Sequence, residues 1–180
     1  SSSLVGSEMC IRDSNKGILP IYEPGLEEIL KRNYKQKRLI FTNNLKEAVE
    51  NSDIIFICVG TPTKKNSNSA DLKYVFNVAN NLKKFIKKYK VVITKSTVPV
   101  TTGDKIEKIL IKQKRKKLVD VVSNPEFLRE GEAIRDFLSP DRVVVGTDSN
   151  KANKYLKNLY LPIVKTVSYT HLTLPTSQYV

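Results

Sequence analysis

Short β-branched runs alternate with stretches of helical periodicity along this sequence, and that alternation limits the fold more than any other feature. Residues 53–59 form an apolar run of strand length, which is typical of a strand covered on both faces. Residues 91–94 and 118–122 are further β-branched runs, and apolar residues keep helical spacing over residues 70–88, the longest helix expected. Strands that alternate with helices indicate parallel βαβ units. We therefore expect an α/β fold with a doubly wound, Rossmann-like parallel sheet.

The remaining patterns complete the expected order of elements. Further strands are expected at residues 38–42 and 143–146, and further helices at residues 24–33, 45–49, 101–110, 133–138 and 152–159. Pro24 suits the first position of the first helix, because its missing N–H would be unpaired there anyway. Asn43 or Asn44 is expected to cap the short second helix, and Thr101 or Thr102 the helix that begins there.

Three of the expected strands end in turns that carry glycine, hydroxyl or carboxylate groups. These turns are Gly60-Thr61-Pro62, Ser96-Thr97 and Asn124-Pro125-Glu126. Because the carboxyl ends of parallel strands lie on one edge of a sheet, we expect the three turns to meet there. Ligands of open α/β sheets bind at that edge. The sequence therefore predicts a ligand site formed by these turns.

The third turn opens the most unusual segment of the chain, residues 123–131. Glu126, Arg129 and Glu130 place two carboxylates and a guanidinium within five residues, with two large apolar residues between them. One interpretation is an ordinary surface loop with an internal ion pair. The other is a binding or catalytic segment, since a plain surface turn has little use for large apolar side chains between its charges.

The chain is strongly basic, with 31 Lys and Arg residues against 18 Asp and Glu residues and a formal net charge of +13. Such an excess would suit an anionic partner. The basic residues are spread over expected helix faces, however, and no aromatic residues alternate with them to stack bases, so nucleic-acid binding is not expected. No run is long enough for a membrane span. The two cysteines do not suggest disulfides, and His171 has no neighbours that suggest a metal site.

The two ends of the chain differ from its middle. Residues 1–14 show no helical or strand period and lack the apolar core of a signal peptide. Residues 167–180 are similar in character. We expect both ends to be non-native, like translated vector sequence, or else disordered, and to carry no function. Residues 15–166 then form the domain.

Six segments of that domain form an ordered set. They read LPIYEPGL at residues 19–26, VGTP at residues 59–62, ADL at residues 70–72, KSTVPV at residues 95–100, SNPEFLREG at residues 123–131 and SPDRVV at residues 139–144. Together they resemble the UDP-glucose 6-dehydrogenase family, a branch of the UDP-glucose/GDP-mannose dehydrogenases. One such segment would be weakly specific, but the ordered set is highly specific. The resemblance implies that residues 15–166 are part of an NAD-binding domain.

The resemblance implies an NAD-dependent enzyme that oxidises C6 of UDP-glucose twice, through an aldehyde stage, to UDP-glucuronate. In the family a cysteine forms a thiohemiacetal, which is oxidised to a thioester and then hydrolysed. Thr97 matches the threonine beside the reacting carbon and its water. Glu126 matches the carboxylate proposed to activate that water, a role that suits a base. Glu130 matches a second carboxylate near the cofactor and is the third expected catalytic residue.

The same resemblance implies the binding residues and partners. The NAD site is expected to be lined by Val59, Gly60, Thr61, Ser96, Thr97 and Glu130. The nucleotide sugar is expected to contact Glu126, Phe127, Leu128, Arg129 and Glu130. The expected partners are UDP-glucose and, for the full-length protein, further copies of itself in a homo-oligomer in the cytoplasm.

The chain also departs from the family pattern. It contains no G-x-G-x-x-G, so neither the phosphate-binding turn nor the acidic residue that would hold the cofactor ribose is found. The family's nucleophile lies in a glycine-rich motif that neither Cys10 nor Cys58 replaces. We therefore expect a fragment whose sheet lacks its first two strands. We also expect these 180 residues alone neither to bind NAD tightly nor to turn over UDP-glucose.

Two alternatives remain open at this point. The sugar could be GDP-mannose or an N-acetylated UDP-hexosamine, because related branches share the segment at residues 124–130. Residues 95–99 and 139–142 look more like the glucose branch. A non-catalytic basic binding module is favoured only by the charge.

Overall fold

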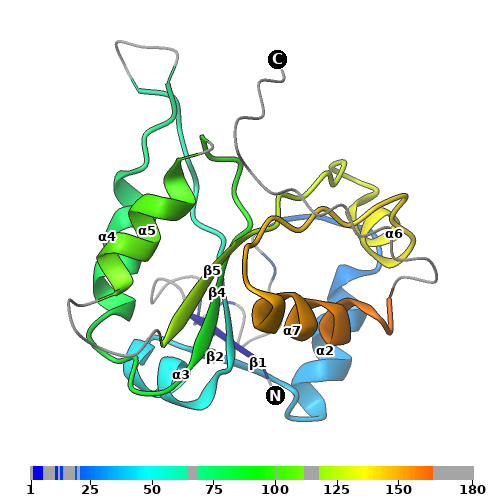
Figure 1. The fold of residues 1–180 in the computed structure, drawn as a ribbon. Helices are drawn as coiled ribbons and strands as arrows, with labels where there is room; N and C mark the ends of the chain where they lie inside the picture. Colours follow the sequence, from blue (N-terminus) through cyan, green and yellow to red (C-terminus); the bar gives the residue numbers. More distant parts are fainter. Residues whose placement is uncertain are drawn as a thin grey trace. The chain divides into compact units, whose positions relative to one another are not determined.

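Parallel strands form the framework of the fold in the computed structural model (Figure 1). The structure describes residues 2–5, 11, 13, 19, 21–64, 69–99, 101–111 and 118–163. The chain divides into two compact units, and each has its own strands and helices. The first unit comprises Ser1–Ser52 with Phe127–Asp141, and the second comprises Asp53–Glu126 with Arg142–Val180.

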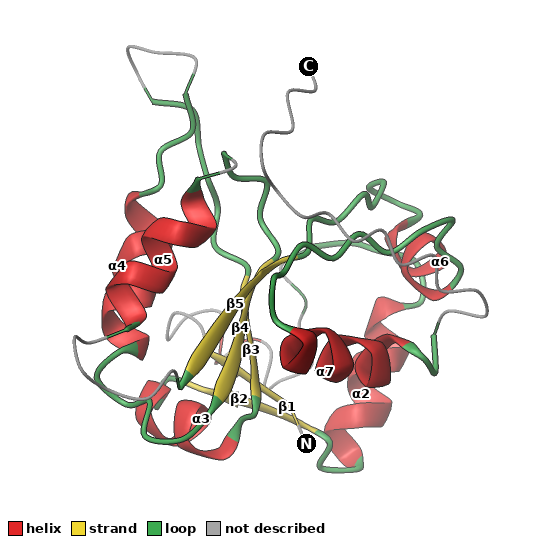
Figure 2. Cartoon of the chain, viewed as in Figure 1, coloured by secondary structure: helices red, strands yellow, loops and turns green. Residues whose placement is uncertain are grey.

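A three-stranded parallel sheet with the order β3–β4–β5 runs through the second unit (Figure 2). Its strands are β3 at Ile54–Ile57, β4 at Lys90–Thr94 and β5 at Val119–Ser123. The central strand β4 is buried along its whole length. The expectation that the strand within residues 53–59 is covered on both faces is wrong for β3, because only Ile57 is buried and Phe56 is exposed. Thr94 is in register with Ile57 on one side and Ser123 on the other, so the three strands end level with one another.

Helices cover both faces of this sheet (Figure 1). α4 at Lys73–Leu82 and α5 at Thr102–Leu110 lie on one face, and α7 at Asn150–Tyr160 lies on the other. Burying an aliphatic side chain of the core stabilises the fold by roughly 1.5–3 kcal/mol. The core beneath α7 consists of Val91, Ile93, Val122, Ala152, Leu156 and Tyr160. This layered arrangement confirms the predicted α/β class with parallel strands.

The first unit has two short parallel strands, β1 at Ser2–Val5 and β2 at Leu39–Thr42. Its helices are α2 at Leu26–Lys35, α3 at Leu45–Asn51 and α6 at Ala133–Leu138. The predicted cap of α3 is confirmed, because the Asn44 side chain accepts a hydrogen bond of 3.2 Å from the N–H of Glu47.

Strand β1 corrects the expectation that residues 1–14 lack regular structure. Residues 2–5 pair in parallel with β2, with Ser2 opposite Leu39 and Val5 opposite Thr42. Residues 2–5 read SSLV, which is neither an apolar run nor an alternating pattern, and their backbone pairing depends on a partner strand far along the chain. The other end, residues 167–180, lies outside the described residues.

Helix α4 is shorter than its apolar pattern predicts. It ends at Leu82, and α7, with 11 residues against 10, is longer. The N–H groups of Phe85 and Ile86 both donate to the carbonyl of Leu82, at 3.0 and 3.2 Å, in a tight turn. Because such a turn keeps its side chains near helical spacing, apolar periodicity continues past the end of the helix.

Two further expectations about local structure are wrong. Residues 143–146 form no strand; the backbone makes one antiparallel bridge, between Ser123 and Gly146. Pro24 lies in a turn before α2, because Gly25 at the N-cap has φ 80°, a left-handed conformation that favours glycine. The predicted position of the α5 cap is confirmed, because Thr101 is its N-cap residue, although its side chain makes no capping hydrogen bond. Among the described residues, no helix is long and apolar enough to cross a membrane.

Candidate active site

The loops that follow β3 and β4 are joined by hydrogen bonds at the carboxyl edge of the sheet. The hydroxyl of Ser96 donates to the carbonyl of Val59 at 2.7 Å. The hydroxyl of Thr61 donates to the carbonyl of Thr97 at 3.3 Å. These bonds confirm the prediction that the turns after the two strands meet. They also turn the Thr61 and Ser96 hydroxyls toward the protein's own backbone.

The loop after β5 is fixed by Asn124, which is buried with an exposed fraction of 1%. Its N–H donates to the carbonyl of Thr94 at 3.0 Å and continues the β4–β5 ladder by one residue. Its side-chain amide donates to the carbonyl of Val144 at 2.7 Å. Its side-chain oxygen accepts a hydrogen bond from the hydroxyl of Tyr160, the last residue of α7. The third turn is therefore anchored two residues before Glu126.

Lys95 links the loops after β4 and β5 electrostatically. Burial lowers the pKa of Lys95, and the carboxylate of Glu126 opposes this by raising it. Cys58, at the end of β3, is exposed, yet surrounding protein atoms remove enough water from its thiol to raise its pKa. The ammonium of Lys95 acts on Cys58 in the other direction. A thiol, an ammonium and a carboxylate thus interact at one edge of the sheet.

Arg129 belongs to the first unit, where it binds Asp136 in α6 and Glu132 at the N-cap of that helix. Its guanidinium donates to both carboxylate oxygens of Asp136, at 3.0 and 2.7 Å, and lies 2.6 Å from Glu132. The hydrogen bonds from Arg129 lower the pKa of Asp136 to about 2. Both acidic partners lie outside residues 123–131, so the ion pair considered within that segment is not what holds this arginine.

Gly131 ends the segment in a conformation that requires glycine, with φ 85°. Its N–H donates to the carboxylate of Glu23 at 2.9 Å, and Glu23 is buried with an exposed fraction of 9%. The first unit thereby joins the segments at residues 19–26 and 123–131. Sequence reasoning did not single out Glu23 as a partner of Gly131, since no local spacing reports a contact between residues so far apart.

The structure places the predicted site residues in two groups. Val59, Gly60, Thr61, Ser96, Thr97 and Glu126 belong to the second unit, on loops at the carboxyl edge of β3, β4 and β5. Phe127, Leu128, Arg129 and Glu130 belong to the first unit, and all four are exposed. Phe127 has the largest exposed fraction among the apolar members of this group, 68%.

Sequence reasoning missed Lys95 and Tyr160. Lys95 directly precedes Ser96 and Thr97, so its place at the strand end could have marked it. Tyr160 continues the spacing of Ala152 and Leu156, four residues apart on one face of α7, and that face covers the sheet. Only its hydroxyl, which reaches Asn124, distinguishes it from an ordinary core residue.

The edge loops suit one wall of a nucleotide site. A Cβ atom added to Gly60 would meet no other atom within 4 Å, so a ligand can approach this backbone closely. Thr97 is exposed beside it, on the loop that Thr61 holds. In the described part of the chain, no three His, Cys, Asp or Glu side chains are grouped as metal ligands would be.

Comparison with known proteins supports a nucleotide site at the edge loops, because the matching family model is that of an NAD-binding domain. The family model described as "UDP-glucose/GDP-mannose dehydrogenase family, NAD binding domain" matches residues 6–164. UDP-glucose 6-dehydrogenase of Rhizobium meliloti is 47% identical over 82% of this chain and 34% of its own length. UDP-glucose 6-dehydrogenase TuaD of Bacillus subtilis is 45% identical over 92% of this chain and 36% of its own length.

Two solved structures share the fold closely. A UDP-glucose dehydrogenase from Pyrobaculum islandicum has a TM-score of 0.84 and 36% identity, covering 92% of this chain and 39% of that one. A GDP-mannose dehydrogenase from Pseudomonas aeruginosa has a TM-score of 0.84 and 34% identity, over the same shares. The chain thus spans about a third of the length of the relatives it matches. Its sequence and its fold together show that it belongs to the NAD-binding domain of the UDP-glucose/GDP-mannose dehydrogenase family.

Proposed function

We propose that the protein containing this chain oxidises UDP-glucose to UDP-glucuronate with two molecules of NAD. The observation that carries the proposal is the place of Thr97 and Glu126 on the carboxyl-edge loops of the sheet, in a chain 47% identical to a UDP-glucose 6-dehydrogenase. The overall reaction balances as R–CH₂OH + 2 NAD⁺ + H₂O → R–COO⁻ + 2 NADH + 3 H⁺. Both hydrides leave C6 before water is added.

Glu126 is the proposed base for that water. A carboxylate that accepts a proton makes water a competent nucleophile for the last, hydrolytic step. The electrostatic coupling of Glu126 to Lys95 supports this role, because it gives the carboxylate a cationic neighbour at the edge of the sheet. Thr97 is proposed to orient the same water through its hydroxyl, on a loop that the hydrogen bond from Thr61 holds in place.

NAD supplies the hydride acceptor for both oxidations. The residues proposed to hold it are Val59, Gly60, Thr61, Ser96, Thr97 and Glu130. The open backbone at Gly60 supports this assignment, because a flat ring or a ribose can pack against a glycine without meeting a side chain.

The nucleotide sugar is proposed to contact the segment from Glu126 to Glu130. The exposed apolar surface of Phe127 supports this, because a sugar face packs well against an aromatic ring. Arg129 is already engaged by Asp136 and Glu132, so we expect its role to be mainly to hold the segment against α6.

The test is the NADH absorbance of the full-length gene product with each nucleotide sugar. We expect two NADH per UDP-glucose consumed and UDP-glucuronate as the product. The variant Glu126→Gln should lower the steady-state rate at least about 100-fold, within the range for general-base catalysis. It should still release NADH in the first turnover. No NADH formation from UDP-glucose by the wild-type protein would refute the proposal.

GDP-mannose is the second candidate substrate. It is favoured by one observation, since the GDP-mannose dehydrogenase structure matches the fold with the same TM-score of 0.84 as the UDP-glucose dehydrogenase structure. Comparing kcat/KM for the two sugars with one preparation discriminates between them. A higher kcat/KM for GDP-mannose would transfer the assignment to that substrate.

We also propose that the full-length protein is a cytoplasmic homo-oligomer in which residues 15–166 form part of the NAD-binding domain. The cytoplasm is supported by the proposed use of NAD and a nucleotide sugar as substrates. Light scattering on the purified full-length protein tests the oligomer. A monomeric mass at micromolar concentration would contradict it.

A further inference from the structure

The turn that carries Glu126 is held by a buried amide with three hydrogen bonds. Asn124 bonds through its N–H to the carbonyl of Thr94, through its side-chain amide to the carbonyl of Val144, and through its side-chain oxygen to the hydroxyl of Tyr160. Proline at position 125 fixes its own φ and restricts the residue before it. Only Pro125 separates Asn124 from Glu126, and its ring restricts the backbone between them. The bonds that fix Asn124 therefore also restrict the position of Glu126.

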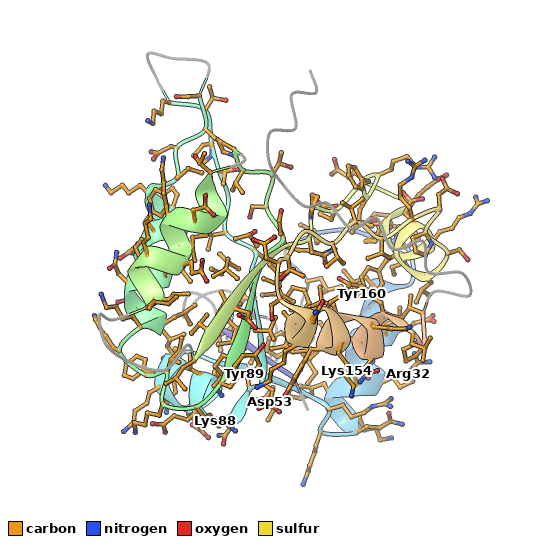
Figure 3. All side chains as sticks on the ribbon, in the orientation of Figure 1. Arg32, Asp53, Lys88, Tyr89, Lys154 and Tyr160 are labelled. Carbon is orange, nitrogen blue, oxygen red and sulfur yellow. The ribbon has the colours of Figure 1, made fainter. Side chains whose placement is uncertain are left out.

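Tyr160 contacts both loops that carry the proposed base and its cation. It is buried, with an exposed fraction of 6%, and packs in the core beneath α7 (Figure 3). Its hydroxyl donates to Asn124 on the loop after β5. The ammonium of Lys95, on the loop after β4, lies 5.9 Å from the centre of its ring, within reach of a cation–π interaction.

The surroundings of Tyr160 favour the protonated hydroxyl that this arrangement needs. Burial raises the pKa of Tyr160 to about 12, so its O–H remains a donor throughout the neutral range. The acceptor is the side-chain oxygen of Asn124, whose amide nitrogen is already directed to Val144. Each partner therefore fixes the orientation of the other.

We propose that Tyr160 and Asn124 are positioning residues that hold the Glu126 carboxylate where it activates water. This inference rests on the proposed role of Glu126 and adds a part of α7 to the site. Neither residue touches the reacting atoms. Loss of the Tyr160 hydroxyl removes one of the three bonds that hold Asn124, while the ring remains to fill the core and to face Lys95.

The test compares Tyr160→Phe with Glu126→Gln in the full-length gene product. Tyr160→Phe removes one oxygen atom and keeps the buried ring. Both hydrides leave before the hydrolysis that Glu126 serves, so a misplaced Glu126 should slow steady turnover and spare the first NADH formation. We expect Tyr160→Phe to lower kcat about tenfold, as expected for one lost hydrogen bond, with KM for UDP-glucose within about twofold of the wild type. A rapid burst of NADH should precede the slow phase.

The matched control is Tyr155→Phe, which removes a hydroxyl from the same helix. Tyr155 packs with its ring 5.9 Å from that of Tyr89, and this variant should show neither a burst nor a lower kcat. Asn124→Ala should show the same burst as Tyr160→Phe, and the double variant should be no slower than the slower single variant, because both act through one contact.

The outcomes separate this inference from the proposed function. A wild-type rate for Tyr160→Phe beside a slow Glu126→Gln would overturn the positioning pair alone. The same would follow if Tyr160→Phe lowered the burst and the steady rate in equal proportion, since a general loss of folded protein would do that. A wild-type rate for Glu126→Gln would remove the role of Glu126 and this inference with it. A wild-type protein that reduces NAD with no nucleotide sugar would overturn both.

Discussion

At the scale of the residue, Lys95 shows how burial and charge are balanced at the candidate site. Its surroundings remove water and lower its pKa, and the carboxylate of Glu126 partly restores it. Burying an ammonium is costly unless an anion lies near it. The carboxylate proposed as the base therefore also helps to keep Lys95 charged, and the two residues are best considered as a pair.

Thr102 presents the opposite case, a buried polar atom that is not satisfied. Its side-chain oxygen has no hydrogen-bond partner among the described residues, and the residue is 1% exposed. We expect Thr102→Val to stabilise the protein by about 1 kcal/mol, because it removes the cost of a buried, unpaired hydroxyl at nearly constant shape. Denaturant unfolding measures this. The control, Thr42→Val, removes a hydroxyl that accepts a 2.9 Å bond from the N–H of Asn44 and should not stabilise.

The Arg129–Asp136 pair predicts a pH dependence. Arg129 lowers the pKa of Asp136 from 3.8 to about 2. A carboxyl whose pKa is lower in the folded state adds stability above the unfolded value and loses it as the pH falls through the folded value. That stability should therefore disappear between about pH 4 and pH 2. The amount lost should be small, because the Arg129 side chain is exposed to solvent.

Titration of the Asp136 carboxyl by NMR tests this pair directly. In Arg129→Gln we expect the pKa of Asp136 to rise back toward 3.8. Arg135→Gln is the control, because Arg135 is the weakest of the groups that lower this pKa, and its loss should have a smaller effect. If the pKa of Asp136 were the same in Arg129→Gln as in the wild type, the contact with Arg129 would not be what lowers it.

At the scale of the element, helix α7 is attached to β5 at both of its ends. At the start, Ser149 caps the helix by accepting a 3.1 Å bond from the N–H of Ala152, and its hydroxyl donates to Asp120 on β5. At the end, Tyr160 donates to Asn124, just beyond β5. Apolar contacts alone would let a helix slide along a sheet, whereas two directional bonds set its register.

Ser149→Ala tests the first of these attachments. It removes a helix cap and a donor to Asp120, a carboxylate with an exposed fraction of 6%. We expect a loss of about 2 kcal/mol in the free energy of unfolding, from the cap and the buried hydrogen bond together. Ser139→Ala, at an exposed position after α6, should be nearly neutral. Equal stability of the two variants would show that the Ser149 contacts add nothing.

The sequence predicted helices and strands where a local pattern determines them. It did not predict which side chains contact one another across the fold. The three strands of the second unit follow their β-branched runs, since side chains of that kind favour a covered sheet. The end of α4 was missed because Phe85 and Ile86 keep helical spacing through a turn. The partners of Arg129 and of Asn124 were missed because each contact depends on how an entire helix packs.

At the scale of the whole molecule, the recognised segments are distributed over both units. The segments at residues 59–62 and 95–100 belong to the second unit, whereas residues 19–26 and 127–131 belong to the first. Hydrogen bonds join the segments within each unit. Ser96 donates to Val59 in the second unit, and Gly131 donates to Glu23 in the first. The family's order of segments could be read from the sequence. Their division between two units follows from packing, and no local pattern reports it.

The last prediction concerns the 180-residue chain alone, and whether it can bind NAD or oxidise UDP-glucose. Its sequence has no G-x-G-x-x-G, the turn whose N–H groups and helix dipole would bind the pyrophosphate of NAD. By resemblance to the family it also lacks the cysteine nucleophile, and the exposed Cys58, whose thiol has a raised pKa, is a poor substitute. We expect calorimetry to give no NAD binding tighter than about 1 mM, the level of weak and unspecific contacts. We also expect no NADH absorbance with UDP-glucose. The full-length gene product is the positive control in both assays, and turnover by the chain alone would show that residues 1–180 supply a nucleophile and a cofactor site of their own.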